Sequence, residues 1–480
     1  MVSGNRGLRD ASTMASDRFG MLAGGELLGH VPTDLDAALF RRWGAALAAE
    51  APTGGKFVVG GDGRFSTPEF REALVSGMIA SGANVVDLGT VPTPLVHYAR
   101  QRLQADGCAI VTGSHHPPDC NGLKWMLGDH PPSDEQIEQV CRRTDETAPS
   151  EASRGEGVRR ELDVSFDYVA WLQETWIESR ETEATIVLDP MHGCWAERAR
   201  RYLQAVFPRV VFVTVRDEPD AVFHGHTPDC SRPDEIEPLC EAVENHRAHL
   251  GLAFDGDGDC LAVVDEHGVV LTPEESVWLM IRSLGDGLAG ESFVHDALFS
   301  EQIPRQLRAL DATALPVRGG RPLLWRRMIE SGAVCGADIR GHYFFRALSG
   351  GDDALFAACW LIDYLTHCDC SLSEVRRSAP PVHLTPDLHV PADRQLADTV
   401  TKRLRTTWAD HPQQTTDGLC IELNDGWVSV RYQPGEEELA FRFEASSNEE
   451  LLLLVKRFCD DLPELGEDLW TEFELAPGER

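Results

Sequence analysis

The segment Ala253-Phe254-Asp255-Gly256-Asp257-Gly258-Asp259 places three carboxylates at alternate positions along a glycine-rich loop. Two short apolar runs, His249–Phe254 and Leu261–Val264, flank this loop, and their length and composition predict strands. The intervening glycines allow a tight turn, so all three carboxylates can face one point. Hard oxygen ligands in this arrangement suit Mg²⁺, and we predict a strand–loop–strand unit that holds one such ion.

Two other interpretations of this loop stay open. The D-x-D-x-D spacing also occurs in EF-hands, in which Glu266 would be the twelfth position. Against this, Cys260 stands where an EF-hand requires glycine, and strands are expected where its helices should be. The second alternative is a solvated acidic turn that binds no ion.

A second motif, Thr112-Gly113-Ser114-His115-His116-Pro117, follows the apolar run Gly107–Val111 and precedes Asn121-Gly122-Leu123-Lys124. A serine on a turn directly after a strand is exposed and backed by backbone N–H groups, a setting that suits a phosphate. Ordinary turn chemistry would explain an isolated serine–histidine pair. The lysine adds weight, because the chain has only four Lys residues and its compact ammonium can act as a titratable point charge.

Together these segments resemble the α-D-phosphohexomutase family, of the phosphomannomutase/phosphoglucomutase type. That family has a T-A/G-S-H-N-P phosphoserine loop, an N-G-x-K segment, a D-G-D-G-D-R metal loop, a G-E-M-S-G-H sugar loop and a C-terminal R-P-S-N-T-E-P phosphate loop. The resemblance covers nearly the whole chain in the family's order. Its other landmarks here are Val59–Arg64, Val91–Pro94, Asp189–Gly193 and Ala337–Phe345.

Strand-like runs alternate with helical stretches such as Thr67–Ser81, which predicts an α/β fold with mixed sheets. The resemblance implies three similar α/β domains and a smaller C-terminal α+β domain around a central cleft. The domain seams are expected in the charged stretch Thr144–Glu161, near Val264–Gly268 and in the proline-containing stretch Ser378–Thr385. The predicted units are a phosphoserine domain (1–155), a metal-binding domain (156–264), a sugar-recognition domain (265–378) and a phosphate-binding domain (379–480).

The function that the resemblance implies is intramolecular phosphoryl transfer between hexose 1-phosphate and hexose 6-phosphate, through a phosphoserine and a bisphosphorylated sugar. Hexose 1,6-bisphosphate would be the activator. The predicted ligands of the single Mg²⁺ ion are Ser114, Asp255, Asp257 and Asp259. The predicted catalytic residues are Ser114 as phosphoryl carrier and, for proton transfer, His115, Lys124 and His342, although a buried structural role for His342 is an open alternative.

Departures from the family pattern cluster where substrate would bind. Cys260 replaces the last arginine of the metal loop, the sugar loop reads Asp338-Ile339-Arg340, and Trp325 stands where the family has lysine. The segment Arg431–Glu437 keeps the arginine of the phosphate loop but lacks its Ser, Asn and Thr, while Ser446–Glu449 is better explained as a helix N-cap. The predicted substrate contacts are Arg64, Arg321, Asp338, Arg340 and Arg431. A catalytically weakened phosphosugar-binding relative and a metal-dependent sugar phosphatase are the alternative functions.

Composition narrows the partners and the location. The formal net charge of −34 argues against nucleic acid or an acidic membrane, so a small phosphosugar is the expected partner. No apolar run reaches the length of a membrane span, and the N-terminal stretch lacks the apolar core of a secretory signal. Thirteen scattered cysteines show no metal-ligand or disulfide spacing, which predicts free thiols in the cytoplasm. We expect a monomer or a dimer.

Overall fold

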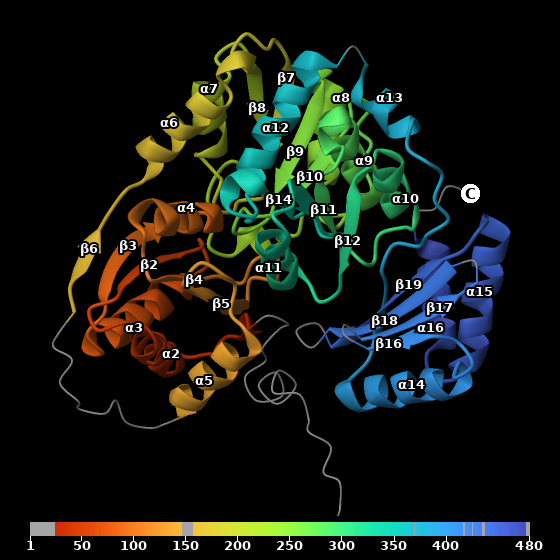
Figure 1. Cartoon of the computed structure of the whole chain (residues 1–480), viewed down its shortest axis with the longest axis horizontal. Coiled ribbons are helices and arrows are strands. Elements are labelled where there is room, and N and C mark those ends of the chain that lie inside the picture. The colour runs from red at the N-terminus through yellow and green to blue at the C-terminus, as the bar shows by residue number, and fades with distance from the viewer. Residues whose placement is uncertain are drawn as a thin grey trace, which may run out of the picture.

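The computed structural model describes residues 25–145, 157–368, 370–415, 418–424, 426–433 and 437–476, and its strands form four sheets (Figure 1). The first sheet has six strands, in the spatial order β1 (Leu27–His30), β5 (Cys120–Leu127), β4 (Gly107–Val111), β2 (Lys56–Gly61), β3 (Asn84–Thr90) and β6 (Arg159–Glu161). Its pairs on the β1 and β5 side are antiparallel and the rest are parallel. The sequence predicted β5 only as a segment carrying Lys124, and in the structure it is a buried strand.

Two helices of the first unit pack unusually closely. A Cβ atom added to Gly44 of α2 (Ala37–Glu50) would lie 2.0 Å from a carbonyl oxygen of α3 (Thr67–Ala80), and one added to Gly77 of α3 would lie 2.0 Å from a carbonyl oxygen of α2. Only glycine permits this approach, which brings the helix backbones together beneath the sheet. The remaining helices before the second sheet are α4 (Thr93–Leu103), α5 (Asp134–Asp145) and α6 (Ser165–Thr175).

The next two sheets have four strands each and are also mixed. The second sheet has the order β10 (Leu261–Val264), β9 (Leu250–Phe254), β7 (Thr185–Asp189) and β8 (Val211–Thr214), and the third has β12 (Thr313–Val317), β11 (Ser292–Asp296), β13 (Cys335–Ala337) and β14 (Tyr343–Phe345). Their helices are α7 (Ala199–Val206), α8 (Glu237–His246), α9 (Pro273–Leu284), α10 (Gln302–Ala309), α11 (Arg321–Ser331), α12 (Ala354–His367) and α13 (Leu372–Arg377). The prediction of an α/β fold with mixed sheets is confirmed.

The fourth sheet is antiparallel throughout, with the order β15 (Leu388–Pro391), β19 (Glu438–Glu444), β18 (Gly426–Gln433), β17 (Leu419–Leu423) and β16 (Gln413–Gln414). Its helices are α14 (Arg394–Thr407), α15 (Asn448–Asp461) and α16 (Gly466–Leu475). Ser447 caps α15 by accepting a hydrogen bond from the Glu450 N–H, as the sequence predicted. The last helix that the structure describes is α16, which follows α15.

The four domain boundaries stay predictions. Within the expected seam Thr144–Glu161, residues 146–156 lie outside the described residues, and Arg159–Glu161 form β6, which pairs with β3 of the first sheet. The chain therefore completes its first sheet after the boundary predicted at residue 155. Across the part of the chain that the structure describes, no helix is long and apolar enough to cross a membrane.

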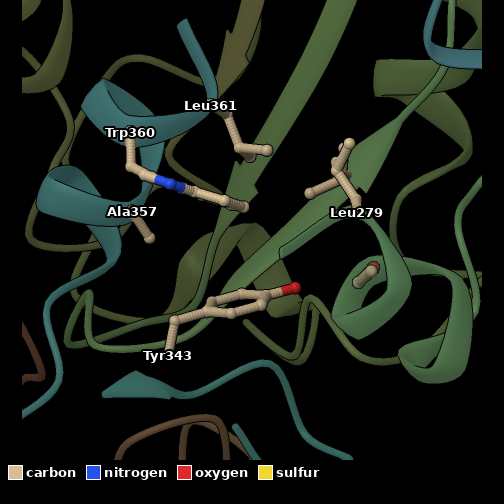
Figure 2. Close-up of a pocket in the computed structure, with 7 residues that line it drawn as sticks. Leu279, Tyr343, Ala357, Trp360 and Leu361 are labelled. Atoms are coloured by element: carbon tan, nitrogen blue, oxygen red, sulfur yellow. The ribbon is translucent and has the colours of Figure 1, made fainter. Parts of the chain in front are cut away.

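One apolar core joins the first three sheets and fixes the loops between them. Figure 2 shows part of it, in which Trp360 and Leu361 of α12 face Leu279 of α9 and Tyr343 of β14. The space that these side chains enclose is too small for a water molecule. Because Tyr343 follows His342 directly, this packing holds one end of the predicted sugar loop in place.

Candidate active site

The loop after β4 is held from behind by a buried arginine. Arg64 is only 1% exposed, and its guanidinium donates to the carbonyl oxygens of Ser114 (2.7 Å), His116 (2.7 Å) and Cys120 (3.1 Å). Its Nε lies 2.9 Å from Asp62 Oδ2. The sequence predicted a substrate contact for Arg64, but with its donors directed at the loop this side chain positions Ser114 instead. Asp62, which sequence reasoning did not assign, completes the same support.

Ser114 has a left-handed backbone conformation, with φ of +49°. Such a conformation is uncommon for a residue with a side chain and persists where surrounding contacts enforce it. The Ser114 N–H donates to Thr112 Oγ1 (2.8 Å), and Asp62 accepts hydrogen bonds from Thr112 Oγ1 and the Gly113 N–H. These contacts hold the backbone on both sides of the serine in a fixed conformation.

The metal loop between β9 and β10 meets this serine. Its three aspartates are buried, with carboxylate oxygens within 4.8 Å of one another. Gly258 adopts φ of +80° and its N–H donates to Asp255 Oδ1, which also accepts from the Cys260 N–H. Ser114 Oγ lies 3.3 Å from the other Asp255 oxygen. The two motifs that the sequence singled out, 141 residues apart, thus converge.

Lys124 of β5 lies between the serine and the metal loop. Its Nζ is 2.8 Å from Asp257 Oδ2, 2.7 Å from Asp259 Oδ2 and 3.4 Å from Ser114 Oγ. Although burial alone would lower the pKa of Lys124, the carboxylates of Asp257 and Asp259 hold it well above its usual value. The side chain is therefore a fixed positive charge beside the serine hydroxyl.

The donor set of the metal loop fits Mg²⁺. Asp257 Oδ1 is a buried oxygen that accepts no hydrogen bond from any residue the structure describes. Burial, followed by the charges of Asp257 and Asp259, raises the pKa of Asp255 well above its usual value. Buried carboxylates held this close need compensating positive charge, and Mg²⁺ prefers a few carboxylates with room left for water or phosphate.

His115 is fixed as a hydrogen-bond donor toward the serine. Arg340 Nη1 lies 2.9 Å from His115 Nε2, and a guanidinium can only donate, so Nε2 accepts and the ring proton resides on Nδ1. That Nδ1 is 3.4 Å from Ser114 Oγ. Burial and then the positive charge of Arg340 lower the pKa of His115 well below its usual value, which keeps the ring neutral.

His342 lies beside the metal loop, in a cluster of carboxylates. Its Nδ1 is 2.8 Å from Asp352 Oδ2 and 3.6 Å from Asp259 Oδ1. Burial opposes its protonation, but the charges of Asp338 and Asp259, followed by the contact with Asp352, raise the pKa of His342 to about 10. The imidazolium supplies a positive charge beside Cys260, where the family's metal loop has arginine.

Comparison with known proteins agrees with this geometry. Profiles described as "Phosphoglucomutase/phosphomannomutase, alpha/beta/alpha domain I" and "domain II" match residues 25–150 and 166–268. The phosphomannomutase/phosphoglucomutase of Pseudomonas aeruginosa is 28% identical over 443 residues, which cover 90% of this chain and 92% of that protein. This chain belongs to the α-D-phosphohexomutase family. It is an enzyme of the phosphomannomutase/phosphoglucomutase type.

Solved structures give the same assignment of fold. A phosphoglucomutase/phosphomannomutase family protein from Burkholderia thailandensis is 27% identical and superimposes with a TM-score of 0.77, covering 95% of this chain and 99% of that one. The N-acetylphosphoglucosamine mutase of Aspergillus fumigatus, solved with GlcNAc-6P and magnesium, is 12% identical with a TM-score of 0.59 and covers 95% and 99% of the two chains.

Asp352 is a second buried carboxylate beside the site that the sequence did not single out. It accepts from Arg321 Nε (2.6 Å) and Nη2 (2.8 Å) as well as contacting His342. Arg321 also contacts Glu26 (3.2 Å) and lies 3.3 Å from Asp259 Oδ2. Arg321, predicted to bind substrate, is buried and directed at carboxylates. It joins the metal loop to Asp352, which in turn contacts His342. A signal for Asp352 was its position directly after Gly350-Gly351.

The sugar loop and the C-terminal domain meet through one arginine. Asp338 Oδ1 accepts from the backbone N–H groups of Arg340 (2.9 Å) and His342 (3.0 Å), so one oxygen of this predicted sugar ligand shapes the loop itself. Arg340 Nη2 donates to Gln433 Oε1 (3.1 Å) while Nη1 contacts His115.

Arg431, the remaining arginine of the phosphate loop, forms an ion pair with Asp387. The sequence analysis predicted that it contacts substrate, and the residues that follow Gln433, 434–436, lie outside the described part of the chain. Burial is opposed by the charges of Arg431 and Arg442, which together lower the pKa of Asp387 to about 2. The carboxylate is therefore charged and holds the Arg431 guanidinium.

Proposed function

We propose that this phosphohexomutase is an intramolecular phosphotransferase that interconverts hexose 1-phosphate and hexose 6-phosphate. Phosphorylated Ser114 carries the phosphoryl group, and a bisphosphorylated sugar is the intermediate. The observation that carries this proposal is the set of contacts around Ser114 Oγ, at 3.3 Å from Asp255 Oδ2, 3.4 Å from Lys124 Nζ and 3.4 Å from His115 Nδ1. One hydroxyl thus meets a carboxylate of the metal loop and two N–H donors.

Three residues of the active site have different roles in the proposed phosphoryl transfer. A sugar hydroxyl attacks the phosphorus of phosphoserine and gives up its proton, and the P–Oγ bond breaks. Negative charge develops on Ser114 Oγ, which takes up one proton, so the number of protons is unchanged over the whole transfer. Lys124 and His115 both direct N–H groups at that oxygen, so both stabilise the charge by hydrogen bonding, and the Lys124 ammonium is placed to return a proton to it. His342, held as an imidazolium, serves as a positive charge rather than a base.

Mg²⁺ is the proposed cofactor, held by Asp255, Asp257 and Asp259 with the phosphate of Ser114. When bound, the ion would neutralise charge on the transferring phosphoryl group. The magnesium and GlcNAc-6P in the Aspergillus fumigatus mutase, and glucose 1,6-bisphosphate in a second structure of that protein, support a phosphosugar substrate, the same ion and a bisphosphate activator here. The monomeric or dimeric state and the cytoplasmic location stay predictions.

A direct assay tests this function. The purified protein is incubated with Mg²⁺, catalytic glucose 1,6-bisphosphate and, in separate reactions, glucose, mannose or glucosamine 1-phosphate. Formation of the matching 6-phosphate, absent in Ser114→Ala, supports the mutase. Stoichiometric release of inorganic phosphate would identify a phosphatase instead. A protein that is phosphorylated and binds phosphosugar without forming product would be the weakened relative.

A further inference from the structure

Three metal-ligating side chains outside the active site gather at the end of the β1–β5 pair. His30 is the last residue of β1, Cys120 is the first of β5, and the two face each other in the strand register. Asp119 precedes Cys120. His30 Nδ1 lies 3.3 Å from Asp119 Oδ2 and 3.6 Å from Cys120 Sγ, and the three ligand atoms lie within 4.8 Å of one another.

These separations match those that a tetrahedral zinc ion imposes on its ligands. With Zn–N and Zn–O bonds of about 2.0 Å, a Zn–S bond of about 2.3 Å and tetrahedral angles, a nitrogen and an oxygen ligand lie about 3.3 Å apart. A nitrogen and a sulfur ligand then lie about 3.5 Å apart. The observed distances, 3.3 Å from His30 to Asp119 and 3.6 Å from His30 to Cys120, are close to these values. Thiolate, imidazole and carboxylate together favour zinc over magnesium or calcium.

We propose that His30 Nδ1, Asp119 Oδ2 and Cys120 Sγ bind a zinc ion, with the fourth tetrahedral position open to water. The site is accessible, because His30 and Asp119 are exposed while Cys120 provides a buried anchor. Binding requires the Cys120 thiol to lose its proton, so one proton is released for each zinc ion bound at a pH below the pKa of that thiol.

Backbone contacts connect this site to the phosphoserine loop. The Val31 N–H donates to the Asp119 carbonyl (2.8 Å), and Arg64 contacts the carbonyl oxygens of both Cys120 and Ser114. A zinc ion would therefore fasten β1 to the end of the loop that carries the nucleophile. The alternative is an exposed His30–Asp119 ion pair with a weak thiol–imidazole contact and no affinity for metal.

Cobalt and zinc titrations of the full chain test the site. The protein is freed of metal with a chelator and kept in saturating Mg²⁺, which occupies the carboxylates of the metal loop. Co²⁺ should then produce a thiolate-to-cobalt charge-transfer band. The band should disappear in Cys120→Ser and persist in Cys141→Ser, which removes another buried thiol, and in Cys260→Ser, which removes the thiol of the Asp259–Cys260–His342 cluster.

Zinc affinity, measured by competition with a chromophoric chelator, gives the second readout. Loss of an outer-shell partner typically weakens a metal site 10–100-fold, so loss of a direct ligand in Cys120→Ser or His30→Gln should weaken zinc binding by at least about tenfold. Circular dichroism confirms that each variant is folded. Equal zinc affinity in the parent and in both variants would overturn the proposal. A band lost in Cys260→Ser but retained in Cys120→Ser would also overturn it and would place the metal beside His342.

Discussion

The two ends of the active site use their charged side chains differently. Around Ser114, the donors and carboxylates point at one hydroxyl. At the sugar and phosphate end, Arg321 is paired with Asp352 and Arg431 with Asp387. An arginine that already has a carboxylate partner has less to offer a phosphate. In this chain the side chains around Ser114 therefore point at one hydroxyl, whereas the arginines at the sugar and phosphate end are already paired with carboxylates.

The largest effect is expected from Ser114→Ala. This change removes the phosphoryl carrier and leaves Lys124 and His115 in place, so mutase turnover should fall to background. Intact mass should show one phosphate in the parent and none in the variant. Cys194→Ser, a buried change outside the loop, is the matched control and should keep the phosphate. Full activity in Ser114→Ala would show that Ser114 is not the phosphoryl carrier.

Asp257→Asn should produce the next largest effect. The change removes one charged oxygen with little change of shape, and Asp257 Oδ1 is a buried atom without a hydrogen-bond partner among the described residues. Mg²⁺ affinity should fall by at least about tenfold. Isothermal titration of the parent and the variant with Mg²⁺ measures it. Unchanged affinity together with a rise in stability would favour the acidic turn that binds no ion.

Arg340→Ala tests the sugar and phosphate end of the active site. This arginine contacts both His115 and Gln433, so its loss removes charge-assisted contacts worth on the order of 1.5–3 kcal/mol. If it holds substrate, KM for the phosphosugar should rise roughly ten- to hundredfold. Steady-state kinetics measure KM, and Arg340→Lys is the conservative control. It keeps the positive charge but lacks the planar guanidinium and its several N–H donors, so it separates the effect of charge from that of hydrogen-bond geometry. An unchanged KM would assign Arg340 only to the link between domains.

Arg431→Ala should affect folding more than binding. Its partner Asp387 is largely buried and would lose its closest cation, while Arg442 Nη1 remains 3.8 Å away. The free energy of unfolding should fall by about 1–3 kcal/mol with KM little changed. Urea denaturation and kinetics of the same preparation measure both quantities. A large rise in KM at unchanged stability would restore Arg431 to the phosphate contact that the sequence predicted.

The sequence predicted the chemical centre because its ligands lie within short motifs. Asp255, Asp257 and Asp259 share one loop, and Ser114 and Lys124 are ten residues apart. Glycine spacing and strand ends are local signals, so each loop could be read from its own segment. That the two loops meet was expected only from the resemblance to the family. The α/β class was equally readable from alternating strand and helix patterns.

The supporting contacts could not be predicted because they join distant segments. Asp352 pairs with Arg321 across 31 residues, and Glu26 contacts the same arginine across 295 residues. Arg64 has the charge of a substrate ligand, and only its burial against the loop carbonyls shows its structural role. Cysteine spacing gave no metal signal either, because His30 and Cys120 come together only through strand pairing.

A single-turnover experiment tests most directly whether Ser114 passes its phosphate to a sugar. Protein phosphorylated with labelled glucose 1,6-bisphosphate is freed of ligand and mixed with hexose 6-phosphate and Mg²⁺, and the label is followed on protein, sugar and inorganic phosphate. We predict that the label leaves Ser114 and appears as hexose 1,6-bisphosphate. Label that appears as inorganic phosphate, or that stays on the protein, would contradict the account.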